Sequence, residues 1–212
     1  MQPQSLEESI ARFLSFDLDG GQLALDFTNT IDWRNTTKEY ERLNGYTDLL
    51  GWGVRVGLLD RQEAELLAQK AGESPVEAPR VLAGARELRE LLFRVFDSVI
   101  REDPLDPVDW DRFNRELGRA MGRGGILARE GGFVWAFDRG AGGLDFFRAP
   151  VLKAASDLLT EGNLSRLKRC GAPDCQWLFL DTSRNNSRRW CDMQSCGNRA
   201  KARRHYQKTR RA

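Results

Sequence analysis

The feature that most constrains the fold is the position of the four cysteines. All of them fall within residues 170 to 196, and the preceding 169 residues contain none. Unrelated core cysteines would be scattered along a chain. The N-terminal residues have no basic start followed by an apolar run, so we expect a cytoplasmic chain whose thiols stay reduced. In that setting, clustered cysteines favour a bound metal ion over disulfide bonds.

The spacing within the cluster indicates which metal it binds. Four residues separate Cys170 from Cys175, fifteen follow, and four separate Cys191 from Cys196. Each pair can bring two sulfurs to one side of a tight loop, and four thiolates with no open position are typical of structural zinc. We therefore expect structural Zn²⁺ on these four cysteines. An iron-sulfur cluster, two disulfides and free thiols remain the alternatives.

Charge is distributed unevenly along the chain. Residues 164 to 212 contain 13 Lys or Arg and 3 Asp, a net charge of +10, whereas residues 1 to 163 contain 20 basic and 28 acidic residues, a net charge of −8. Such a split suggests a polyanionic partner for the basic part. Mutual neutralisation of the two parts, or a merely solvated basic face, remains the alternative.

The basic residues lie on the loop between the cysteine pairs and on a predicted final helix. Residues 199 to 211 contain neither Gly nor Pro, so a helix should start at the last cysteine. One face of this helix (Ala202, His205, Tyr206 and Thr209) has no Lys or Arg, and we expect this less charged face to dock on the zinc module or on the N-terminal domain. The residues expected to contact nucleic acid are Arg184, Arg188, Arg189, Arg199, Lys201, Arg203, Arg204, Lys208, Arg210 and Arg211.

Two stretches resemble a known family. The run from Cys170 to Ser183 and the run from Arg188 to Arg204, which includes Cys-Gly-Asn-Arg at 196 to 199, resemble the CGNR-type zinc finger family. The stretch from Leu23 to Arg34 is similar to the domain usually found ahead of that finger in bacterial putative stress-induced transcription regulators. The resemblance implies a zinc-binding, DNA-binding transcription regulator. An RNA- or protein-binding zinc adaptor is the alternative.

The N-terminal part should form a mainly helical α+β domain over residues 1 to 163, followed by the four-cysteine module over residues 164 to 212. Hydrophobic periodicity predicts the helices 23–27, 47–57, 61–71, 88–100, 107–121 and 150–161, and the first of these could also be a strand because its apolar residues alternate. Thr47 is the expected cap of the second helix, and Asp60 with Glu63 resembles a capping box before the third. Residues 72–79 are expected to form a proline-bearing connection. Three β-type runs separated by glycines, 126–129, 133–137 and 144–147, predict a small antiparallel meander. A mean hydropathy of -0.55 and frequent charges argue against a membrane protein.

One polar cluster makes the N-terminal domain a candidate sensor. Asn29, Asp32, Trp33 and Arg34 lie beside apolar positions and could line a pocket for a small-molecule effector, although capping and salt-bridge roles explain them equally well. The chain has no nucleophile elbow, phosphate loop, dinucleotide fingerprint or metalloprotease helix, so we do not expect an enzyme. A small-molecule-binding protein or an enzyme using the N-terminal domain remains the alternative.

Overall fold

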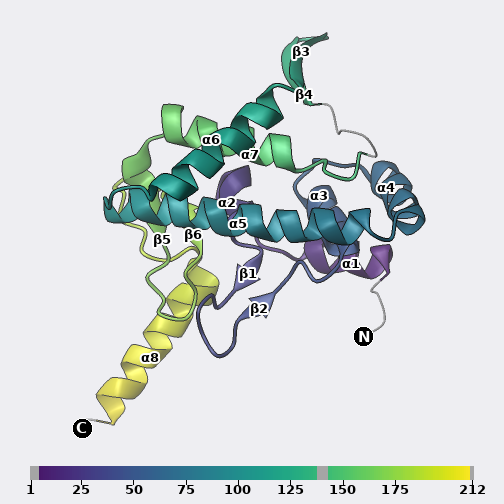
Figure 1. Cartoon of the computed structure of the whole chain (residues 1–212). Coiled ribbons are helices and arrows are strands. Elements are labelled where there is room, and N and C mark those ends of the chain that lie inside the picture. Colours follow the sequence, from purple (N-terminus) through teal and green to yellow (C-terminus); the bar gives the residue numbers. More distant parts are fainter. Residues whose placement is uncertain (1–4, 138–142, 211–212) are drawn as a thin grey trace.

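The structure, a computed structural model, describes residues 5–137 and 143–210 (Figure 1). The helices are α1 (Leu6–Leu14), α2 (Leu23–Thr28), α3 (Tyr46–Arg55), α4 (Arg61–Glu73), α5 (Glu77–Arg101), α6 (Pro107–Met121), α7 (Arg148–Glu161) and α8 (Asn198–Thr209), with a 3-10 turn η1 (Leu164–Arg166) and a π-helical turn η2 (Met193–Gly197). The strands form three antiparallel pairs: β1 (Ile31–Asp32) with β2 (Tyr40–Glu41), β3 (Gly124–Arg129) with β4 (Gly132–Phe137), and β5 (Leu167–Arg169) with β6 (Leu178–Leu180). The mainly helical α+β class is confirmed.

Local capping explains where several helices begin. The Asp60 side chain accepts from the Glu63 amide while Glu63 reaches back to the Asp60 amide, the predicted capping box of α4. The prediction that Thr47 caps the next helix upstream was wrong. That helix, α3, starts one residue earlier, and its Asp48 carboxylate accepts from the amides of Asn44 and Gly45.

Helix α5 is longer than its sequence pattern indicated. We expected residues 72 to 79 to form a proline-bearing connection, but α5 begins at Glu77 and contains Pro79 in its first turn. Proline is tolerated there because the first-turn amides have no partner within the helix. The helix then runs to Arg101 and crosses the body of the molecule (Figure 1).

The core surrounds the short helix α2, which was correctly predicted as a helix rather than a strand. Its residues from Ala24 to Thr28 are all buried. The Phe27 ring lies 5.0 Å from that of Trp52 on α3 and 5.6 Å from that of Phe147, just before α7. Contacts from α5, α7 and β6 enclose the same helix. The apolar cluster built here continues without a break into the four cysteines.

The predicted meander is a two-stranded hairpin. Strands β3 and β4 pair in register from Gly124 opposite Phe137 to Arg129 opposite Gly132. The third run, 144–147, is not a strand, because Leu144, Phe146 and Phe147 turn into the core instead of pairing. Helix α7 also begins at Arg148, ahead of the predicted start at proline 150.

Candidate metal centre and nucleic-acid interface

The four cysteines meet at one point. Their sulfurs all lie within 4.8 Å of one another, and the four side chains are buried. The Sγ atoms of Cys175 and Cys191 are 3.7 Å apart, and those of Cys191 and Cys196 are 3.6 Å apart. A tetrahedron with zinc–sulfur bonds of about 2.3 Å has edges of about 3.8 Å. The donor set and its spacing therefore fit one structural zinc ion.

Backbone hydrogen bonds hold the two cysteine loops in place; we call the loop from Cys170 to Cys175 the first knuckle and the loop from Cys191 to Cys196 the second knuckle. In the first, the Cys170 amide donates to the Trp177 carbonyl at 2.8 Å, which closes the loop between β5 and β6. In the second, the Asp192 carboxylate accepts from the Ser195 amide and starts the π-helical turn that carries Cys196. The knuckles are joined where the Gly171 amide donates to the Arg189 carbonyl at 2.8 Å. The peptide framework thus positions the sulfurs.

Two arginines lie beside the cysteines, where positive charge offsets the negative charge of the thiolates. The Arg199 guanidinium lies 3.0 Å from the Cys196 sulfur and offsets part of the −2 charge that four thiolates leave around Zn²⁺. Arg188 donates to the carbonyls of Trp190 and Cys191 and lies over the Phe179 ring, with 4.8 Å from guanidinium carbon to ring centroid. Both side chains therefore support the module itself.

The acidic residues of the module are also used internally. Asp181 is fully buried and accepts from the Lys168 ammonium, the Ser183 hydroxyl and the Arg188 amide. Burial alone would raise the pKa of Asp181, but these donors and the Ser183 amide outweigh it and hold the pKa well below its usual range. Asp174 pairs with Arg203 at 3.1 Å. The outer surface of the module is left predominantly basic.

The zinc module is joined to the helical domain through buried polar contacts. The Asn29 amide donates to the Leu178 carbonyl and its oxygen accepts from the Leu178 amide, both at 2.9 Å. The Trp177 indole N–H donates to the Ile31 carbonyl at 3.1 Å. Farther along β6, the Leu180 amide donates to the Gly20 carbonyl at 3.0 Å. We call this set of contacts the joint.

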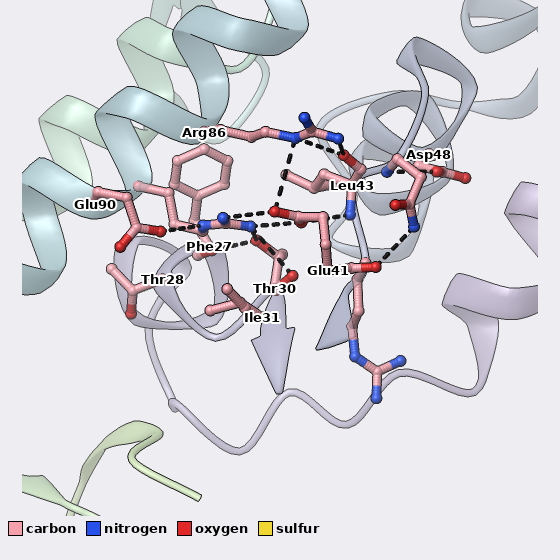
Figure 2. A network of polar contacts seen from close by, with 12 residues as sticks. Phe27, Thr28, Thr30, Ile31, Glu41, Leu43, Asp48, Arg86 and Glu90 are labelled. Carbon is pink, nitrogen blue, oxygen red and sulfur yellow. Dashed lines mark hydrogen bonds and ion pairs between the residues drawn. The ribbon is translucent and has the colours of Figure 1, made fainter. Parts of the chain in front are cut away.

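A buried ionic network supports the helical side of the joint (Figure 2). Arg89 of α5 is 3% exposed and makes two 2.7 Å bonds to the Glu41 carboxylate. Burial lowers the pKa of Arg89 and raises that of Glu41, but the pairing outweighs burial in both and keeps both charged. Arg86 donates to the Leu43 carbonyl beside them. This network fixes β2, and β2 fixes Ile31 on β1.

The four residues proposed to line a ligand pocket have different surroundings. Asn29 belongs to the joint and is 1% exposed. Arg34 is buried against the Phe93 ring at 4.0 Å and pairs with Glu90. Asp32 and Trp33 line a crevice of about 160 Å³ against the cysteines, and neither Asn29 nor Arg34 is part of its lining. The structure therefore does not gather the four into one pocket.

The residues proposed to contact nucleic acid fall into three groups. Arg188, Arg199 and Arg203 are occupied by the module, as described above. Four others are exposed, and no ion pair joins any of them to another described residue: Arg184, Arg189, Lys201 and Arg210. The side chains of Arg204 and Lys208 lie outside the described part of the chain, and so does residue Arg211.

Helix α8 extends away from the rest of the molecule (Figure 1). Its contacts with other elements centre on η2. The prediction that the less charged face of α8 docks on the rest of the chain was wrong, because Ala202 and Thr209 are exposed and Tyr206 is 72% exposed. The side that turns toward the zinc module instead carries Arg199 and Arg203, which contact the Cys196 sulfur and the Asp174 carboxylate. The side chain of His205 lies outside the described set.

Sequence reasoning missed a basic groove beside the first knuckle. This groove, about 770 Å³ in volume, is lined by Lys168, Arg169, Gly171, Gln176 and Arg189, among others. Its first two cations lie on β5, a three-residue strand too short to recognise by pattern. A usable signal was the Lys-Arg pair directly before Cys170, which the knuckle necessarily places near the metal.

Comparison with known families follows the same division of the chain. The ABATE model, described as "Putative stress-induced transcription regulator", matches residues 21–162, and the CGNR zinc finger model matches residues 166–209. No curated protein matches the chain in sequence. Within the described residues, every helix is too short or too polar to cross a membrane.

Proposed function

Because the chain belongs to the ABATE family of putative stress-induced transcription regulators and carries that family's CGNR zinc finger, we propose that it regulates transcription by binding DNA. The zinc module over residues 164–212 makes the contact, and residues 1–163 hold and orient it. No enzymatic step is part of this proposal. No effector is part of it either, since Asn29 and Arg34 have structural partners.

The observation that carries the proposal is the division of charges within the zinc module. Its three aspartates are paired or capping, whereas Arg184, Arg189, Lys201 and Arg210 remain exposed. Arg184 and Arg189 lie on the inter-cysteine loop, Lys201 lies on α8, and Arg210 directly follows α8, the helix that extends into solvent (Figure 1). An exposed basic helix fixed to a metal site can enter a major groove or lie along phosphates.

The test is DNA affinity of the zinc-loaded chain across a salt series. Replacing Arg184 and Lys201 with glutamine should weaken binding and lower the slope of log affinity against log salt by about 0.9 for each phosphate that the variant no longer neutralises. Zinc content should not change, because neither side chain contacts the cysteines. A matched control, Lys70→Gln with Arg115→Gln, removes two exposed charges from α4 and α6 and should leave the affinity unchanged.

Three results would contradict the proposal. The first is no salt-dependent DNA binding by the wild-type chain. The second is an equal fall in affinity in the control variant, which would indicate a nonspecific effect of net charge. The third is a preference for RNA over DNA of the same sequence that depends on the 2′-hydroxyls, which would favour the adaptor alternative.

A further inference from the structure

The β3–β4 hairpin exposes an unusual amount of apolar side chain. Ile126 is 61% exposed, Leu127 50%, Phe133 79%, Val134 41% and Trp135 46%. None of the residues in either strand is buried. The hairpin extends beyond the end of α6 and away from the body (Figure 1). This surface is distinct from the zinc module and does not depend on the proposed function.

Both faces of the hairpin are apolar. Ile126 lies opposite Trp135, and Leu127 lies opposite Val134, so neighbouring pairs point to opposite faces. A strand with one face on a core and one in water would alternate apolar with polar residues. Helix α6 contacts β3, and the Lys153 ammonium lies 5.4 Å from the Trp135 ring centroid. They leave most of both faces uncovered.

The hairpin is poorly protected as it stands. At about 200 Å² for each fully exposed side chain, the five residues present roughly 550 Å² of apolar surface per copy, a patch size that commonly marks an interaction site. A lone two-stranded hairpin is only marginally stable in water, and three or more strands are needed for independent stability, so added strands would stabilise it.

The composition of strand β4 favours one particular partner. From Gly131 to Phe137 the chain has no charge and no proline, the residues that normally protect a strand edge against pairing. A strand without charge does not match a phosphate backbone or a charged peptide, but it matches an identical uncharged strand. We propose that β4 pairs antiparallel with β4 of a second copy of this chain, which gives a four-stranded sheet across a two-fold axis.

Symmetry limits the register of this pairing. Residues directly opposite in an antiparallel pair share a face, so a two-fold perpendicular to the sheet must pass beside a residue rather than between two residues. Centring it on Trp135 pairs the whole run from 133 to 137. Phe133 of each copy then faces Phe137 of the other, and the aromatic face of the hairpin continues across the sheet.

The test is the association state of the zinc-loaded full chain, measured by sedimentation velocity from about 1 to about 100 µM. We expect the wild type to pass from monomer to dimer in this range. Phe133→Glu combined with Val134→Glu places like charges on both faces and should keep the chain monomeric. The matched control, Leu66→Glu with Val108→Glu, changes two residues that are 60% and 74% exposed elsewhere, and should still dimerise.

A second readout does not depend on any variant. In the wild type, hydrogen exchange of the amides in residues 132 to 137 should slow as protein concentration rises, because pairing protects them. A wild-type chain that stays monomeric with concentration-independent exchange would overturn the proposal. Dimerisation that survives the hairpin substitutions, or that the control substitutions also abolish, would overturn it as well.

Discussion

Replacing Asn29 with alanine tests whether the zinc module and the helical domain form one cooperative unit. The Asn29 side chain is 1% exposed and makes both of its 2.9 Å bonds to the backbone of Leu178 on β6. Alanine removes both bonds and leaves a buried amide and a buried carbonyl without a partner. At about 1 to 3 kcal/mol for each, the free energy of unfolding should fall by about 2 to 6 kcal/mol.

The assay is urea unfolding of the zinc-loaded chain, followed by helical signal and by zinc release. A decrease of about 3 kcal/mol corresponds to a fall in melting temperature of about 6 to 12 °C in a chain of this size. The matched control is Asn114→Ala, which removes an exposed amide bonded to the Trp110 carbonyl and should cost at most about 0.5 kcal/mol.

Two results would refute this reasoning. If Asn29→Ala cost less than about 1 kcal/mol, the two bonds would not be the buried link that the geometry indicates. If the helical signal and the zinc release changed at different urea concentrations in the wild type, the two parts would unfold separately, and the joint would be a contact between independent units.

Three further predictions concern the metal, its charge and pH. Chelating the zinc should speed hydrogen exchange in α2 as well as in the zinc module, because β6 covers that helix. Arg199→Leu should weaken zinc retention about 10- to 100-fold in a chelator competition, whereas Lys201→Leu should not, since only Arg199 contacts Cys196. Burial raises the pKa of Asp26 from 3.8 to about 7, so its folded state holds a proton that the unfolded state has released, and stability should fall by up to about 1.4 kcal/mol per unit as pH rises from about 4 to about 7. Asp26→Asn should remove this slope in urea unfolding.

Each of these predictions has an outcome that contradicts it. Unchanged exchange in α2 after chelation would limit the role of zinc to the module. Equal zinc release in the Arg199 and Lys201 variants would indicate a general effect of charge. For Asp26, the quantity to compare is the difference in free energy of unfolding between the wild type and Asp26→Asn at each pH. Protonation of the thiolates affects both proteins in the same way and cancels in this difference. A difference that does not change with pH would refute the titration.

Much of the fold could be predicted because its signals are local. The capping box at Asp60, the proline after Asp106 and the cysteine spacing each fix nearby backbone, and the structure has the expected helix or loop at each. The run at 144–147 failed for the opposite reason. Its apolar residues resemble a strand, but whether they pair or pack is decided by the distant Phe27 ring, which stacks on Phe147.

The candidate site was predictable in its metal and less so in its surface. Spacing alone locates four thiolates, whereas the use of each arginine depends on what the fold places beside it. Arg188 and Arg189 are adjacent in sequence, yet the first donates into the module and the second is exposed. Likewise, Asn29 resembles a pocket residue until β6, 149 positions away along the chain, is seen to supply both of its partners.

That separation affects how the chain folds during synthesis. The helical domain emerges from the ribosome first, but the groups that satisfy Asn29 and cover α2 belong to residues made 149 positions later. At about 5 to 20 residues per second, the nascent chain waits roughly 7 to 30 s with this part of its core open. Core closure then requires the last cysteines and a zinc ion. Newly made chains should therefore become protease-resistant only after Cys196 has left the ribosome, and only where free zinc is sufficient.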